Sequence, residues 1–250
     1  MYMPGFLNLG VGFRKYFVAL PALDDELKRA AYRIRHAVYC EELGYEPVRP
    51  DGLETDEYDA QASHCLLQGV ADPRYVGCIR IVSPRREDPQ RPLPFELLCG
   101  ATLDRTVVDP ARLPRERIAE VSRLAVIRQY RRRRGEAARP GGDIDENDFG
   151  TPERPRFPYI PVGLYLGMLA QARRQGIETL FVLTEPRLAS HLSRLGVRLT
   201  RIGAPVEHRG MRVPSMLRVN EVIDGFGAFV RPLYDVIAGE IEAAYRAVGT

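Results

Sequence analysis

The chain has few cysteines, and their spacing fits neither a metal site nor a disulfide framework. Cys40, Cys65, Cys78 and Cys99 are separated by 25, 13 and 21 residues. Cysteine-based zinc sites need closely spaced pairs, and disulfide scaffolds need a much denser set. The four histidines show no ligand spacing either. We therefore predict no metal site, and we expect buried thiols in a cytoplasmic protein.

A long hydrophobic run is also missing. The N-terminal segment, residues 1–14, is apolar, but it lacks a basic beginning, contains Pro4 and three glycines, and is too short to cross a bilayer. We expect no integral membrane segment. The sequence leaves open whether residues 1–14 fold over the rest of the chain or make peripheral contact with a membrane.

The signatures of common covalent enzymes are absent as well, since neither a G-x-S-x-G motif nor a cysteine–histidine nucleophile pattern occurs. The composition is that of a folded globular protein, with 45% hydrophobic and 28% charged residues over 250 positions. This length allows one large α/β domain or two small ones. The net charge of +3 is modest, but six arginines lie between Arg128 and Arg139.

Hydrophobic periodicity predicts the order β α β β β α β α β β, followed by a final helix. The strands are expected at residues 15–20, 63–70, 75–82, 117–127, 178–185, 197–203 and 211–219, and the helices at residues 24–43, 162–176, 186–196 and 229–248. A single crossover helix near the middle of this order indicates an α/β (α+β) fold, a mixed sheet with helices on both faces.

The same pass along the chain suggests three parts. An apolar segment, residues 1–14, precedes a main domain over residues 15–220, and residues 221–250 form a helical extension. Within the main domain, residues 131–158 combine an arginine run, a Gly-Gly pair, an acidic stretch and several prolines without any periodicity. We interpret residues 131–158 as an inserted surface loop.

Charged residues inside apolar strands are the strongest chemical signal. Arg80 and Arg123 lie in strands that are otherwise apolar, where an unpaired charge costs several kcal/mol. Each therefore needs an acidic partner. The other members of such a charge-balanced cluster would be Arg35, Asp56, Asp59 and Glu120. From residue types alone, the cluster either pins the loop of residues 44–59 to the sheet or forms an active site.

Four features support a family resemblance: RHAVYCEELGY starting at Arg35, DGLETDEYD ending at Asp59, Arg80 in its hairpin, and E-x-S-R-L-A-V starting at Glu120. In residue type and spacing they resemble the acyl-homoserine lactone (autoinducer) synthase family and the related N-acyl amino acid synthases. The whole chain looks most similar to the exosortase (PEP-CTERM) system-associated acyltransferases. The resemblance runs from about residue 15 to residue 219 and implies a GNAT-like acyltransferase fold.

The resemblance also implies roles for individual residues. It places the charge cluster beside an acyl-donor cleft. Tyr39 stands where the family has Phe, Tyr45 where it has Trp on the acceptor side, and Phe95 matches a further family aromatic that could equally be a core residue. The change at Tyr45 makes S-adenosylmethionine a less certain acceptor.

Acyl transfer to an amine needs a neutral amine, a thioester held within attack distance, and donors for the developing oxyanion. The catalytic candidates are Glu120, Ser122 and Arg123. We expect Glu120 to take the amine proton, directly or through water, while backbone N–H groups after Arg123 bind the thioester oxygen.

Donor binding is predicted for the end of this strand and the arginine run that follows it. The candidates are Val126, Arg131, Arg132, Arg133, Arg134 and Gly135. The run fits a loose GNAT pattern that holds a pantetheine pyrophosphate, but we favour a patch that docks the acidic surface of acyl carrier protein. Nucleic-acid binding and a solvated loop are the alternatives, and no aromatic platform accompanies the charge to favour nucleic acid.

For the acyl chain, Leu164, Met168, Leu180 and Val182 offer an apolar lining, although they are first of all core residues. The favoured function is an N-acyltransferase that moves a fatty acyl group from acyl carrier protein or acyl-CoA to the amino group of an amino acid or similar small amine. No tightly bound cofactor is expected. The alternatives are an acyl-homoserine lactone synthase using S-adenosylmethionine and a non-catalytic acyl-binding module with the same fold.

Overall fold

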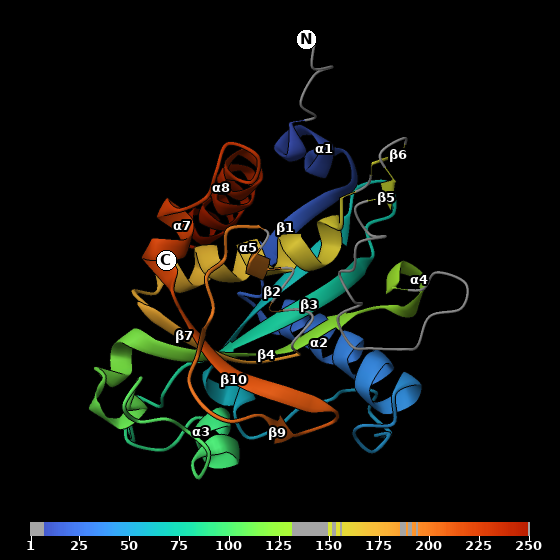
Figure 1. Ribbon diagram of the computed structural model, residues 1–250. Coiled ribbons are helices and arrows are strands. Elements are labelled where there is room, and N and C mark those ends of the chain that lie inside the picture. The colour runs from blue at the N-terminus through green and yellow to red at the C-terminus, as the bar shows by residue number, and fades with distance from the viewer. Residues whose placement is uncertain are drawn as a thin grey trace.

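The computed structural model describes residues 8–131, 150–151, 154–155, 157–185, 189, 192–193 and 195–249. A single large sheet runs through this part of the chain (Figure 1). Its strands are β1 (Phe17–Pro21), β2 (Ala62–Gly69), β3 (Tyr75–Val82), β4 (Ile118–Val126), β7 (Thr179–Thr184), β8 (Thr200–Arg201), β9 (Val206–Glu207) and β10 (Met211–Arg218). The order is β1-β2-β3-β4-β7-β10-β8, with β9 paired to β10.

All neighbouring strands of this sheet are antiparallel except β4 and β7, which are parallel. A parallel pair needs a crossover connection, and here the crossover contains α5 (Tyr159–Arg174). The predicted mixed sheet with one crossover helix is therefore confirmed. The short strands β5 (Gly150–Thr151) and β6 (Arg154–Pro155) pair with each other outside this sheet.

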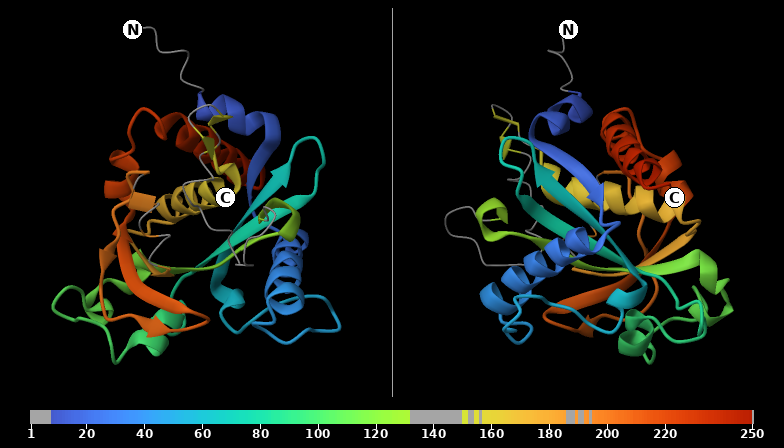
Figure 2. Two further views of the ribbon diagram at one scale, coloured as in Figure 1. Left: turned by 45° about the vertical axis from the view of Figure 1, so that its right-hand side comes forward. Right: turned by 180° about the vertical axis from the view of Figure 1, so that it is seen from behind.

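The strands β4 and β7 stay together for only part of their length. Their pairing joins residues 118–121 to residues 179–182 and then stops. Beyond this point β4 remains paired with β3, while the end of β7 remains paired with β10. The sheet therefore opens between its two halves, and the divergence of β4 from β7 and β10 can be followed in Figure 2.

A β-bulge in β4 lies at the start of this opening. Arg80 of β3 faces Ser122 and Cys78 faces Ala125, so that one residue of β3 opposes two residues of β4, Arg123 and Leu124. Arg123 has a φ of 53°, a left-handed conformation that costs a non-glycine residue about 1 kcal/mol. The extra residue shifts the alternation of side chains, because a bulge leaves one residue out of the ladder.

Helices cover both faces of the sheet. On one face α5 packs against β1, β2 and β3, α8 (Arg231–Ala247) packs beside it against β1, and α1 (Leu9–Tyr16) contacts α8 and β1. On the other face α2 (Asp25–Arg35) packs against β2 and β3. Figures 1 and 2 show this layering. Glycines let α5 lie close to the sheet: a Cβ on Gly167 would come 2.5 Å from Sγ of Cys65.

Helix α2 begins with Asp24 as its N-cap, whose side chain accepts a hydrogen bond from Leu27 N at 2.8 Å. It continues into a π-helical segment, η1 (His36–Glu42), which is wider than an α-helix. Such widened turns are frequent at functional sites. Together the two segments occupy the single helix predicted at residues 24–43.

Several element boundaries differ from the sequence prediction. The first strand begins at residue 17 rather than 15, because residues 9–16 form α1 with Asn8 as its N-cap. The strand expected at residues 197–203 is reduced to β8. The structure adds helices α3 (Pro94–Cys99), α4 (Arg128–Arg131) and α7 (Val219–Asp224). Most of the predicted loop 131–158 and helix 186–196 lies outside the described residues. Among the helices described here, none is long and apolar enough to cross a membrane.

Candidate active site

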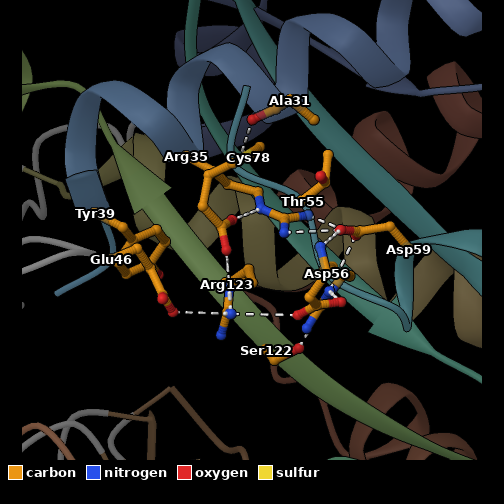
Figure 3. Close-up of polar contacts among 12 residues, drawn as sticks. Ala31, Arg35, Tyr39, Glu46, Thr55, Asp56, Asp59, Cys78, Ser122 and Arg123 are labelled. Atoms are coloured by element: carbon orange, nitrogen blue, oxygen red, sulfur yellow. Dashed lines mark hydrogen bonds and ion pairs between the residues drawn. The ribbon is translucent and has the colours of Figure 1, made fainter. Parts of the chain in front are cut away.

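A network of ion pairs lies on the face of the sheet that α2 covers, next to the bulge (Figure 3). Arg35, at the end of α2, is completely buried. Two of its guanidinium nitrogens donate hydrogen bonds to the carboxylate of Asp59, at 2.6 Å and 2.9 Å. Its Nε donates to Glu54. Bidentate arginine–carboxylate pairs of this kind are the strongest hydrogen-bonded ion pairs in proteins. Arg35 and Asp59, two members of the expected charge cluster, thus pair with each other, and Glu54 joins them.

Arg80 and Arg123 extend this network along β3 and β4. Arg80 donates to Asp56 at 2.7 Å, to Asp59 at 3.0 Å and to Ser122 Oγ at 3.1 Å. Arg123 lies 3.2 Å from Asp56 and 3.2 Å from Glu54. In a regular strand Ser122 and Arg123 would point to opposite faces, and the bulge turns both toward the same network.

The carboxylates of this network are held in their charged form. Burial alone would raise the pKa of Asp59, but hydrogen bonds from His64 and Arg35 hold this pKa well below its usual range. Burial also opposes ionisation of Glu54, whose pKa is nevertheless lowered by Arg35 and Arg123. The arginines therefore compensate the cost of removing these carboxylates from water.

Sequence reasoning missed four members of the site. Glu54 and Glu46 lie in the acidic loop of residues 44–59, from which the sequence analysis named only Asp56 and Asp59. Nε2 of His64 lies 3.2 Å from Asp59, and burial lowers the pKa of this imidazole. Arg209 comes from the β9–β10 turn and pairs with Glu46. The loop's many acids were a usable signal, whereas the other two residues depend on the folded chain.

Glu120 lies apart from the ion pairs, which corrects its expected place among them. Its buried carboxylate accepts a hydrogen bond from Phe95 N at 2.7 Å, and among the described residues it forms no ion pair. Burial, only partly offset by the Phe95 N–H and by Arg80, raises the pKa of Glu120 to about 7. A carboxylate with this pKa can exchange a proton near neutral pH.

The three predicted aromatic residues occupy different surroundings. The Phe95 ring stacks on the Phe181 ring with centroids 4.4 Å apart in the core, so only its backbone N–H reaches a candidate catalytic group. Tyr39 donates its hydroxyl hydrogen to the carbonyl oxygen of Leu124, the second bulge residue, at 2.7 Å. Tyr45 stacks on Tyr39 at 6.5 Å. Tyr39 therefore contacts the bulge directly, and Tyr45 packs on Tyr39.

An apolar pocket lies on the opposite face of β4, under α5, where β4 and β7 separate. Its lining residues are Val121, Tyr165, Met168, Leu169, Val182, Leu192, Val197, Leu199 and Leu217. Met168 and Val182 were predicted to line an acyl pocket. Leu164 and Leu180 are not part of this lining and are completely buried in the core, because they face the paired region of the sheet.

The predicted donor-binding residues are described only in part. Val126 is buried at the end of β4, whereas the side chain of Arg131 and residues 132–135 lie outside the described part of the chain. Within the described residues no group of histidine, cysteine and carboxylate side chains could hold a metal ion. The site therefore consists of ion pairs, tyrosines, the bulge and the pocket.

The sequence of this chain is similar to one family model and to two curated enzymes. Residues 34–139 match a family model described as an acetyltransferase (GNAT) domain. The acyl-homoserine-lactone synthase of Pseudomonas fluorescens is 40% identical over 67 residues, which are 26% of this chain and 34% of that protein. The corresponding synthase of Pseudomonas chlororaphis is 38% identical over 66 residues, 25% of this chain and 34% of that protein. The matched segment thus spans about a third of these curated relatives.

Solved structures resemble a much larger part of the chain. TofI, in a ternary complex with an inhibitor and MTA, has a TM-score of 0.57 at 19% identity and covers 89% of this chain and 99% of its own. FeeM, an N-acyl amino acid synthase from uncultured soil microbes, has a TM-score of 0.53 at 18% identity, with coverages of 85% and 96%. These likenesses concern the fold. Residues 34–139 are thus similar to a GNAT domain, within a mixed α/β fold whose sheet opens beside a buried ion-pair network.

Proposed function

We propose that this chain transfers a fatty acyl group from a thioester, on acyl carrier protein or coenzyme A, to the amino group of an amino acid or similar small amine. The observation that carries the proposal is the arrangement around the bulge in β4. The apolar pocket lies on one face of β4 and the charged network on the other. An acyl chain suits the first surface, and a small polar acceptor suits the second.

The bulge is the proposed position of the thioester carbonyl. Because a bulge turns peptide groups out of the regular ladder, N–H groups next to Arg123 can face the opening between β4 and β7. Donors in that position would stabilise the negative charge that develops on the carbonyl oxygen when the amine attacks. Arg123 itself would contribute a positive charge, because its guanidinium remains on the charged face of β4.

Glu120 is the proposed general base. Its pKa of about 7 lets it accept the amine proton at neutral pH, directly or through a water molecule. Amide formation then breaks the carbon–sulfur bond, and the proton can pass on to the departing thiolate. Ser122 is a positioning residue in this scheme, because its hydroxyl accepts a hydrogen bond from Arg80.

The similarity to acyl-homoserine-lactone synthases supports a second candidate, lactone formation from S-adenosylmethionine. One experiment separates the two. The purified protein is incubated with long-chain acyl carrier protein, the same acyl-CoA, a pool of amino acids and S-adenosylmethionine, and the products are identified by mass spectrometry. An N-acyl amino acid supports the proposal, and a lactone supports the second candidate. Absence of any acylated product in all mixtures refutes both.

The choice of donor is tested in the same assay. We propose that the arginine run at residues 131–134 docks acyl carrier protein, which carries an acidic surface. Raising the salt concentration should then weaken the use of acyl carrier protein far more than the use of acyl-CoA, because salt screens exposed charges. Equal use of both donors at every salt concentration would exclude docking by these arginines.

A further inference from the structure

One ion pair connects the two halves of the opened sheet. Glu46 follows the π-helical segment η1, and Arg209 lies in the turn between β9 and β10, 163 residues later. The Arg209 guanidinium contacts the Glu46 carboxylate and lies 5.6 Å from the centre of the Tyr45 ring. The pair therefore spans the opening on the charged side of β4.

Both partners are held in place by their own backbones. The carbonyl oxygen of Tyr39 accepts hydrogen bonds from Tyr45 N at 2.8 Å and Glu46 N at 3.1 Å. In the opposite turn, Arg209 has a φ of 54°, and its carbonyl oxygen accepts a hydrogen bond from Arg212 at 2.9 Å. Non-glycine residues held in a left-handed conformation cluster at active sites and at sites that clamp ligands.

The pair is close to the proposed reaction centre. Glu46 also lies 3.3 Å from Nη2 of Arg123, the bulge residue. Figure 3 shows Glu46 next to Arg123 and Tyr39 at the edge of the network. An amine that attacked a thioester at the bulge would therefore lie close to Glu46 and Arg209.

The pair also differs from the rest of the network in its access to solvent. The side chains of Glu46 and Arg209 are each 25% exposed, whereas those of Arg35 and Glu54 are 0% and 3% exposed. Among the described residues, Arg209 directs a hydrogen bond only to Glu46, although a guanidinium has several further donors. Arg209 can therefore donate hydrogen bonds to a second carboxylate without breaking a buried contact.

We propose that the Arg209–Glu46 pair is the binding site for the two charged groups of an α-amino acid acceptor, with its carboxylate on Arg209 and its ammonium group on Glu46. The inference rests on the proposed function and narrows the acceptor to a molecule with a free α-carboxylate. Such a zwitterion adds one charge of each sign, so the network stays balanced. A simple amine or an amino acid amide would leave Arg209 without a new partner.

The test measures binding as well as turnover, so that it does not depend on catalysis. N-dodecanoyl-glycine and N-dodecanoyl-glycinamide differ only in the carboxylate, and their affinities are measured by isothermal titration calorimetry on the full chain. Wild-type protein should bind the acid more tightly than the amide, by on the order of ten- to a hundredfold. Arg209→Gly should remove this preference, since glycine keeps the left-handed turn and deletes the guanidinium.

Two matched variants complete the experiment. Arg209→Lys restores a positive charge without the planar fork and should recover part of the preference. Arg201→Ala removes an exposed arginine of β8, whose Nε donates to the Gly203 carbonyl, and should leave the preference unchanged. Thermal unfolding of each variant establishes that it is folded before the titration.

The outcomes separate this inference from the proposed function. Equal affinity of wild-type protein for acid and amide, failure to bind either compound, or an undiminished preference in Arg209→Gly would overturn the carboxylate site. If the preference behaves as expected but no acyl transfer to any amine occurs, the carboxylate site stands and the proposed acyltransfer function fails. Turnover with amines that lack a carboxylate, at the rate of amino acids, would also overturn the inference.

Discussion

Replacing the buried Glu120 by glutamine should remove catalysis and at the same time stabilise the protein above neutral pH. Glutamine has nearly the same shape and can still accept the hydrogen bond from Phe95 N. It cannot ionise. The substitution therefore isolates the titration of one buried carboxyl group, and the expected effects on activity and stability have opposite signs.

The magnitude follows from the pKa. Burial raises the pKa of Glu120 from 4.5 to about 7, and each pKa unit corresponds to about 1.4 kcal/mol, so the difference amounts to about 3 kcal/mol. The folded state binds the proton more tightly than the unfolded state. The contribution of protonated Glu120 to stability is thus fully present below pH 4.5 and is lost as the pH rises to about 7.

Urea unfolding of wild-type protein and Glu120→Gln at a series of pH values measures this loss directly. Between about pH 4 and about pH 8, the variant should gain about 3 kcal/mol of unfolding free energy relative to the wild type. Glu116→Gln removes an exposed carboxylate four positions earlier and should show no such trend. A flat difference between Glu120→Gln and wild type over this range would refute the raised pKa.

Activity supplies the second half of the test. If Glu120 is the base, the wild-type rate should rise with pH and level off above about 7, and Glu120→Gln should be slower by on the order of a hundredfold or more. Full acyl-transfer rates in a stabilised Glu120→Gln protein would refute the catalytic role of Glu120. The raised pKa of its buried carboxyl group would then still stand.

Three further predictions follow from the packing. Arg35→Met removes a completely buried arginine that pairs with both Glu54 and Asp59, and should cost about 3–5 kcal/mol of unfolding free energy because it leaves buried carboxylates uncompensated. Urea unfolding checks this, and a cost below about 1 kcal/mol would contradict it. Gly167→Ala should destabilise the chain by about 1–3 kcal/mol in a thermal melt, since its Cβ would meet Cys65 at 2.5 Å, and an unchanged melt would contradict the close packing of α5. Val182→Phe should fill the apolar pocket and shift the preferred acyl chain in a mixed-donor assay to shorter lengths, and an unchanged preference would exclude the pocket as the acyl site.

The sequence by itself determined the order of the main elements and the chemistry of the charged network. Strand alternation and helix periodicity depend on neighbouring residues, so the hairpin at residues 63–82 and the crossover from β4 through α5 to β7 were predictable. Arginines in apolar strands required buried acidic partners, because an unpaired charge there is too costly. Arg35, Asp56, Asp59, Arg80 and Arg123 do meet in the structure.

Only the tertiary structure decided which groups stand together at the opening in the sheet. The bulge at Arg123 adds one residue to a strand whose sequence is regular, and this reverses the face on which every following side chain lies. Glu120 lost its expected ion pairs because a backbone N–H of α3, a helix that sequence periodicity did not reveal, lies against its carboxylate instead. Arg209 reaches Glu46 only because the fold brings residues 163 positions apart into contact, and a contact of that range leaves no local pattern in the sequence.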